Sequence, residues 1–266
     1  MNISKKSSVL CLIILIFLWE FSCKFSNIHS LIPSFSQVVI ELWAEICNFK
    51  LIKATCISLS SVLIGYMISI LLSLLVSVVC MNSNLATVLF STLYKILNPL
   101  PSVAILPIIL LLTGLSYSSI SLKLHISAQS SIIILIFHSV FWPMLASNIM
   151  GFNSIPTVFE DFARNIEIST LKKYILIYIP SASSHIITGL RTSWGRSWRS
   201  LISAEAIFGI SGSTQGLGYY IYYHRAFANM TNIFAGIIII SIISLFAETI
   251  FSFIEKNTIQ KWGISK

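Results

Sequence analysis

The sequence predicts an all-α, polytopic membrane protein with about six transmembrane helices. Apolar residues make up 56% of its 266 positions, and charged residues make up only 10%. A water-soluble globule of this size needs more polar surface than that, so the bilayer is the expected solvent. A hydrocarbon core about 30 Å thick takes roughly 20 apolar helical residues per crossing. Residues 1–266 are therefore expected to form a single transmembrane domain with no separate soluble domain.

The expected crossings can be placed by their apolar stretches. They are residues 9–23, 55–81, 85–112, 128–149, 181–208 and 233–253. Residues 36–49 carry apolar side chains at three- and four-residue spacing, which predicts an amphipathic helix on the outer membrane surface. Residues 209–223, rich in Gly, Ser and Tyr, are expected to form an outer segment. The bias of Lys and Arg toward the inner side places both termini in the cytoplasm.

The third crossing contains Pro99, Pro101 and Pro107. Each proline removes a backbone donor and so bends or breaks a helix. In lipid, such a break is tolerated only where protein or a water-filled cavity satisfies the freed carbonyl groups. We therefore expect these three prolines to line a translocation path and residues 99–107 to act as a hinge.

Three arginines, Arg191, Arg196 and Arg199, lie inside the fifth crossing. Each costs about 2.5 to 3.5 kcal/mol at the centre of a membrane helix, so they are not expected to face lipid. At about 100° per residue they share one helix face. One interpretation is a cationic path lining, together with Glu205, that attracts an anionic solute. The other is a set of helix-locking ion pairs and ring contacts with Glu205, Glu248, Trp194 or Trp198.

Other patterns exclude several classes of function. The net charge of +8 comes from scattered residues with no basic stripe, so no nucleic-acid partner is expected. The five Cys and five His residues show no metal-ligand spacing, so no metal site is expected. No nucleophile elbow, zincin motif or paired carboxylates occur, so no catalytic residues are expected. Gly216-Leu217-Gly218 lacks the context of a phosphate-binding loop, and no cofactor is expected on this chain.

A polar segment at about residues 156–180 separates the fourth and fifth crossings. It reads Asp161-Phe162-Ala163, three residues, Glu167, nine residues and Ile177-Tyr178-Ile179-Pro180. Basic residues in it favour the cytoplasmic surface. The pattern predicts a short helix with a compact apolar face that fits a groove in a soluble partner. The alternative is an ordinary inner loop with an interfacial helix.

This segment resembles the coupling loop of bacterial ABC importer permeases, the membrane subunits of binding-protein-dependent transport. The pattern in that family is Glu-Ala-Ala, three residues, Gly, nine residues and Ile-x-Leu-Pro. On this resemblance, the residues expected to couple the chain to an ATPase are Asp161, Phe162, Ala163, Glu167, Ile177 and Pro180. Permeases of the nitrate/sulfonate/taurine type also have motifs similar to Trp19-Glu20, Pro99-Leu100-Pro101, Gly189-Leu190-Arg191, Ala204-Glu205, Gly216-Leu217-Gly218 and Lys261-Trp262-Gly263.

The chain departs from the family pattern at Phe162, where the family has Ala, and at Glu167, where the family has Gly. Glycine allows the left-handed backbone conformation that turns the loop between its two short helices. Glutamate adopts this conformation only at a cost, so we expect the bend to move to Asn165.

The resemblance implies a permease that homodimerises in a bacterial-type inner membrane. It also implies two cytoplasmic ATPase subunits, which bind ATP and Mg, and an extracytoplasmic substrate-binding protein. The expected function is inward transport of a small anionic solute such as nitrate, sulfonate or taurine by alternating access. The alternatives are an importer for a thiamine-precursor pyrimidine, an ATPase-independent secondary transporter, and an intramembrane enzyme.

Overall fold

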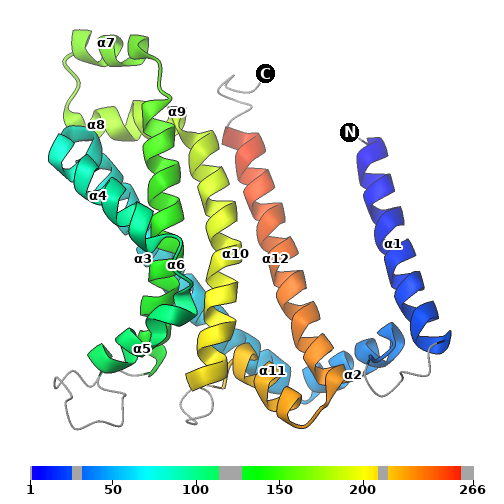
Figure 1. The fold of residues 1–266 in the computed structure, drawn as a ribbon. Helices are drawn as coiled ribbons and strands as arrows, with labels where there is room; N and C mark the ends of the chain where they lie inside the picture. Colours follow the sequence, from blue (N-terminus) through cyan, green and yellow to red (C-terminus); the bar gives the residue numbers. More distant parts are fainter. Residues whose placement is uncertain (1, 26–31, 114–127, 209–214, 259–266) are drawn as a thin grey trace.

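The computed structural model describes residues 2–25, 32–113, 128–208 and 215–258, and every regular element in these ranges is a helix (Figure 1). The body of the molecule contains four long helices. They are α3 (Lys50–Asn82), α6 (Ala128–Asn153), α10 (Ser183–Phe208) and α12 (Met230–Thr258). The predicted all-α class is confirmed.

Among the described residues, three helices are long and apolar enough to cross a membrane: α3, Gln129–Asn153 of α6, and α12. A bent pair, α4 (Asn84–Leu97) and α5 (Ser102–Thr113), makes a fourth if it counts as one broken span. Helix α1 (Asn2–Phe25) has a shorter apolar stretch, and α10 carries Arg191, Arg196, Arg199 and Glu205 within its length. The chain is a multi-pass membrane protein, and the total of six crossings stays a prediction.

Helix α6 packs between α3 and α10, and small residues bring these helices close together. A Cβ atom at Gly65 of α3 would lie 2.8 Å from Ile136 Cγ2, and one at Gly189 of α10 would lie 2.7 Å from Ser147 Cβ. Ser69 donates a hydrogen bond to the Gly65 carbonyl within its own helix. On α3 the buried small residues recur every three or four positions: Ser58, Ser61, Gly65, Ser69, Ser73 and Ser77.

The predicted break in the third crossing is confirmed. Helices α4 and α5 meet at an angle of 104°. Pro99 and Pro101 have no N–H group, so the i to i−4 ladder cannot run through them. Asn98 closes α4 by donating to the Tyr94 carbonyl at 3.0 Å, and Ala104 opens α5 by donating to the Pro101 carbonyl at 2.9 Å. The two helices are therefore separate elements, each with a backbone hydrogen bond at the end that meets the break.

Helices α2 (Phe35–Cys47) and α11 (Leu217–Ala226) lie at one end of the molecule (Figure 1). The predicted amphipathic helix is present as α2, with Val38 buried and Trp43 exposed, and its place on a membrane surface stays a prediction. Residues 217–223 of the expected outer segment belong to α11, and their place on the outer side stays a prediction. Residues 209–214 and the Lys261-Trp262-Gly263 motif lie outside the described residues.

The opposite end carries the polar segment between α6 and α10. Its first helix, α7 (Thr157–Asn165), lies across this end, and α1 begins and α12 finishes on the same side (Figure 1). The other end of α1 is attached to the chain before α2, since Trp19 Nε1 donates to the Pro33 carbonyl at 3.1 Å. The start of α1, the end of α12 and the polar segment thus lie on one side of the described structure, and the cytoplasmic location of that side stays a prediction.

Candidate coupling segment and polar cavity

Helix α7 presents a row of exposed apolar side chains, which we call the apolar face of α7: Val158, Phe159, Phe162 and, just past its end, Ile166. At about 100° per residue these four positions fall within one arc of roughly 100°. Phe159 is 45% exposed and Phe162 is 55% exposed. A polar helix with a compact aromatic patch of this kind suits a groove in a soluble partner.

The opposite face of α7 is held against the rest of the chain. Ala163 is buried, and the Glu160 carboxylate accepts a hydrogen bond from the Tyr178 hydroxyl. Burial and the Glu160 carboxylate raise the pKa of Tyr178 well above its usual range, so this tyrosine remains a donor at neutral pH. The Lys173 ammonium lies 4.9 Å from the centre of the Tyr178 ring. Ala163 therefore fixes α7, and Phe162 beside it is the side chain free to meet a partner.

The chain returns to the body through α8 (Thr170–Lys173), a π-helical turn (Tyr174–Tyr178) and α9 (Ile179–Ser181). The rings of Tyr174 and Tyr178 are 4.8 Å apart, and each lies 5.9 Å from Phe152 at the end of α6. Asn82, the last residue of α3, donates to the Tyr174 hydroxyl at 2.9 Å. The segment is thus fastened to the ends of α3 and α6, with Ile177 and Pro180 half-buried at the junction with α10.

Glu167 adopts the left-handed conformation, with φ of 48°, so the expectation that the bend moves to Asn165 is wrong. The Glu167 N–H donates to the Arg164 carbonyl at 3.1 Å, and the Ile168 N–H donates to the Ala163 carbonyl at 3.3 Å. This pair of bonds is the Schellman motif that ends many helices. It satisfies carbonyls that the helix end leaves free, which offsets the backbone cost of a glutamate in this position.

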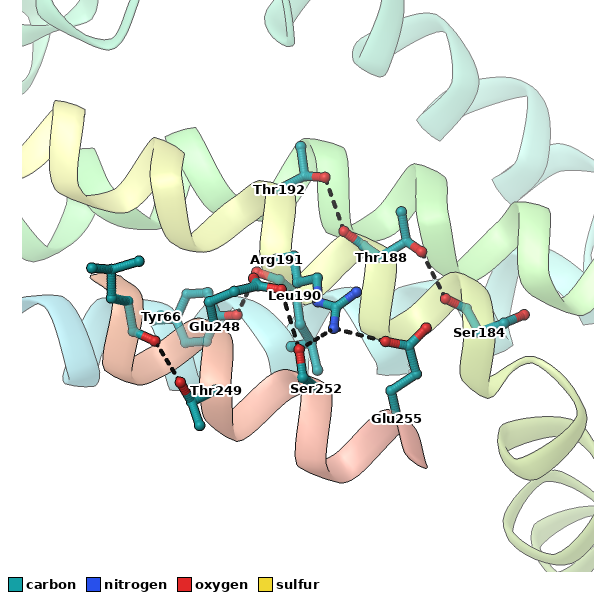
Figure 2. Close-up of polar contacts among 11 residues, drawn as sticks. Tyr66, Ser184, Thr188, Leu190, Arg191, Thr192, Glu248, Thr249, Ser252 and Glu255 are labelled. Carbon is teal, nitrogen blue, oxygen red and sulfur yellow. Dashed lines mark hydrogen bonds and ion pairs between the residues drawn. The ribbon is translucent and has the colours of Figure 1, made fainter. Parts of the chain in front are cut away.

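The three arginines of α10 have different surroundings. Arg191 joins α10 to α12: its Nη2 lies 2.7 Å from Glu255 Oε2 and 3.1 Å from Ser252 Oγ, and its Nε lies 3.2 Å from Glu248 Oε1 (Figure 2). Next to it, the Tyr66 hydroxyl of α3 donates to the Leu190 carbonyl at 2.7 Å. The helix-locking interpretation therefore describes Arg191, with Glu248 as one of its partners.

Arg196 and Arg199 instead line a cavity of about 370 Å³, together with Asn98, Pro99, Pro101 and His138. The cavity lies where the break between α4 and α5 faces α6 and the middle of α10. Arg196 donates to Asn98 Oδ1 at 3.0 Å, and Arg199 is exposed. The structure brings together four of the expected path residues here, while Pro107 is exposed on α5 away from the cavity.

Glu205 lies in a different place, in what we call the buried carboxylate cluster: Ser58, Glu205, Gly216, Leu217 and Gly218. Its side chain is fully buried, and both carboxylate oxygens lie 2.7 Å from Ser58 Oγ. The Gly218 N–H donates to Glu205 at 2.8 Å, and the Leu217 N–H donates to Ser58 Oγ at 2.7 Å. The cluster fastens the start of α11 to α10 and α3, and Glu205 does not line the cavity around Arg196.

Several residues of these sites were not expected from the sequence. Asn98 and His138 complete the cavity, Tyr178 fastens α7, and Ser58 holds Glu205. Asn98 directly precedes the first proline of the break, and a polar residue at the end of a broken helix is a usable signal. The three- and four-residue spacing of serines on α3 also marks a packed helix face, although it does not identify which serine meets Glu205.

Residues 69–260 match the family described as "Binding-protein-dependent transport system inner membrane component". A putative ABC transporter permease protein from Methanocaldococcus jannaschii is 31% identical over 167 residues, which is 63% of this chain and 57% of that protein. The nitrate import permease protein NrtB of Leptolyngbya laminosa is 24% identical over 167 residues, 63% of this chain and 54% of that protein.

A third relative is the putative aliphatic sulfonates transport permease protein SsuC of Bacillus subtilis. It is 26% identical over 168 residues, which is 63% of this chain and 55% of that protein. The matched part of the chain spans about half the length of these curated relatives. The matched family region contains the break between α4 and α5, the polar segment with α7, and all of α10.

Proposed function

Because the chain belongs to the family of binding-protein-dependent transport system inner membrane components, we propose that it is the transmembrane permease subunit of an ATP-driven importer. Separate cytoplasmic ATPase subunits hydrolyse ATP, and this chain converts their movement into transport. Two copies of the chain, two ATPase subunits and an extracytoplasmic binding protein make up the proposed assembly. The proposed solute is a small anion such as nitrate, a sulfonate or taurine, in keeping with the names of the nitrate and aliphatic sulfonate permeases among the relatives.

The observation that carries this proposal is the apolar face of α7. Val158, Phe159 and Phe162 are exposed at the end of the molecule where α1 begins and α12 finishes (Figure 1). Apolar rings on a short polar helix are costly to leave in water, so a partner surface that covers them is favoured. This end is proposed to be cytoplasmic, where an ATPase is available to cover the rings.

The contacts behind α7 offer a route for movement into the membrane helices. A pull on α7 acts through Glu160 on Tyr178. From there it reaches α3 through the bond from Asn82 to Tyr174, and α6 through the edge-to-face contact of Tyr174 with Phe152. The start of α10 follows within a few residues. In the proposed alternating-access cycle, ATP binding closes the ATPase dimer, moves α7, and tilts α3, α6 and α10 around the break between α4 and α5.

The proposal is tested by capture of the ATPase on purified permease. We expect the affinity-tagged chain to retain a nucleotide-hydrolysing subunit, identified by mass spectrometry and by its ATP hydrolysis. Phe162→Ser removes a large exposed ring from the apolar face of α7 and is expected to weaken retention at least tenfold, which corresponds to about 1.4 kcal/mol. Its thermal unfolding should match the wild type, because the ring makes little contact within the chain.

Leu85→Ser is the matched control, since Leu85 is 82% exposed at the start of α4. Retention should be unchanged in this variant. Equal retention by the wild type and Phe162→Ser would contradict the assignment of α7. Transport by the reconstituted chain with no ATPase present would favour an ATPase-independent secondary transporter instead. Ala163→Arg would be a poorer test, because Ala163 is buried and its replacement disturbs α7 itself.

A further inference from the structure

The cavity around Arg196 and Arg199 has a strongly one-sided charge. Its lining residues include these two guanidinium groups and no carboxylate among the described residues. Arg191, five residues before Arg196 on the same helix, differs because Glu248 and Glu255 both lie against it. A cavity with two unneutralised cations attracts anions and repels cations.

Neutral hydrogen-bonding groups surround the two cations. Both ring nitrogens of His138 are buried without a hydrogen-bond partner among the described residues, and His138 lines the cavity. Helix α5 begins at Ser102, another lining residue, so the positive end of its dipole lies at the cavity. A buried donor without a partner is costly, which favours a ligand that accepts hydrogen bonds.

The cavity also has a suitable size and position. Its volume of about 370 Å³ is at the small end of the roughly 300 to 1,000 Å³ typical of ligand pockets. Arg196 lies midway along the 26-residue helix α10, far from both helix ends. A small solute crossing the membrane beside α10 would pass this level, whereas surface ions would not need to enter it.

We propose that this cavity is a transit site for a small oxyanion, a class that includes nitrate, bicarbonate, sulfate and sulfonates. Arg196 and Arg199 hold the charged oxygens, and His138 donates to the same group. The inference deepens the proposed function and rests on it, because a transit site has meaning only in a transporter. Guanidinium groups suit this ligand because their planar N–H pairs match the geometry of oxyanions.

Binding is expected to change the contact between Arg196 and Asn98. Asn98 offers only a neutral amide oxygen, whereas an oxyanion adds charge–charge attraction to the guanidinium and can accept two parallel N–H bonds from it. The anion therefore competes for Arg196 and loosens its tie to the end of α4. Because Asn98 directly precedes the break between α4 and α5, occupancy of the site is linked to the proposed hinge.

The test measures anion-specific stabilisation of the purified chain in lipid nanodiscs without any ATPase. Thermal unfolding is followed while potassium nitrate, bicarbonate, sulfate or methanesulfonate replaces potassium gluconate at constant ionic strength. We expect at least one of these four anions to raise the melting temperature of the wild type along a saturable curve. Arg199→Gln and Arg196→Gln should each weaken that apparent affinity at least tenfold.

Arg191→Gln is the matched control, because it removes an arginine from the same helix outside the cavity. It should lower the melting temperature at every salt composition and leave the anion affinity unchanged. No saturable stabilisation of the wild type by any of the four anions would overturn the proposal, as would an unchanged affinity in both cavity variants. An equal loss of affinity in Arg191→Gln would also overturn it. Any of these failures leaves the capture of an ATPase by α7 untouched, so the two proposals fail separately.

Discussion

The buried carboxylate cluster and the apolar face of α7 differ in whether their side chains find contacts within the chain. In the cluster, a fully buried carboxylate is satisfied by donors from α3 and α11 within the chain. On α7, large rings that water disfavours are left exposed, and a buried alanine and one hydrogen bond hold the helix behind them. The first region needs no contact outside the chain, whereas the second needs a partner surface to cover its rings. Substitutions should therefore affect stability in the first region and association in the second.

The largest expected effect in this comparison is that of Glu205→Ala. The substitution leaves Ser58 Oγ and the Gly218 N–H without their acceptor in a buried site. Hydrogen bonds to charged groups contribute about 1.5 to 3 kcal/mol each, and unsatisfied buried donors cost a similar amount. We expect the free energy of unfolding to fall by about 3 kcal/mol, measured by denaturant titration in mixed micelles.

Glu248→Ala is the control for that loss, since Glu248 is 53% exposed and belongs to a half-exposed ion pair. Its cost should stay below about 1 kcal/mol. A cost for Glu205→Ala no larger than that of Glu248→Ala would break the comparison, because the cluster would then not be a stability element.

A smaller loss is expected for Gly218→Ala in the same cluster. The new Cβ atom would lie 2.6 Å from the Ile202 carbonyl oxygen and 2.7 Å from Glu205 Cβ. Overpacking of this kind costs about 1 to 3 kcal/mol, and we expect about 2 kcal/mol in the same titration.

Gly195→Ala gives the matched control within α10, because its Cβ atom would meet nothing within 4 Å. Alanine is favoured over glycine inside a helix by about 0.8 to 1 kcal/mol, so this variant should be at least as stable as the wild type. If both substitutions were equally harmful, the tight packing of α11 onto α10 would not be the cause.

The smallest effect is expected for Glu167→Gly at the end of α7. Glycine removes a left-handed backbone cost of about 1 to 2 kcal/mol, while the greater freedom of glycine in the unfolded chain offsets part of this gain. A net stabilisation of about 0.5 kcal/mol is expected, with slower amide hydrogen exchange in α7. Asn165→Gly, inside the helix, should do the reverse, and a stabilising Asn165→Gly would show that the bend is misplaced.

Much of the helical architecture could be predicted because, in lipid, the apolar length and the proline positions of a segment largely determine where a helix runs and where it breaks. Apolar length predicted α3, α6 and α12 as crossings, since each backbone group in a membrane must be satisfied within its own helix. The prolines after Asn98 predicted the break, since they remove donors wherever they occur. Glu167 was mispredicted because a residue preference of about 1 kcal/mol is overridden by a complete Schellman motif.

The sites were harder to predict because they depend on contacts between distant parts of the chain. The sequence grouped Arg191, Arg196, Arg199 and Glu205 on one helix, and the structure divides them among three environments. Arg191 meets α12, the next two arginines face the break between α4 and α5, and Glu205 meets Ser58. Helical periodicity gives the face of a residue, and the neighbouring helices decide which partner it meets.

Photo-crosslinking in native membranes tests the central claim, that the apolar face of α7 docks an ATPase, most directly. A benzoylphenylalanine introduced at Phe162 should crosslink to the nucleotide-hydrolysing subunit on irradiation. The same probe at Tyr223, exposed on α11 at the opposite end of the molecule, should not crosslink to it. A crosslink to the ATPase from Tyr223, with none from Phe162, would contradict the account.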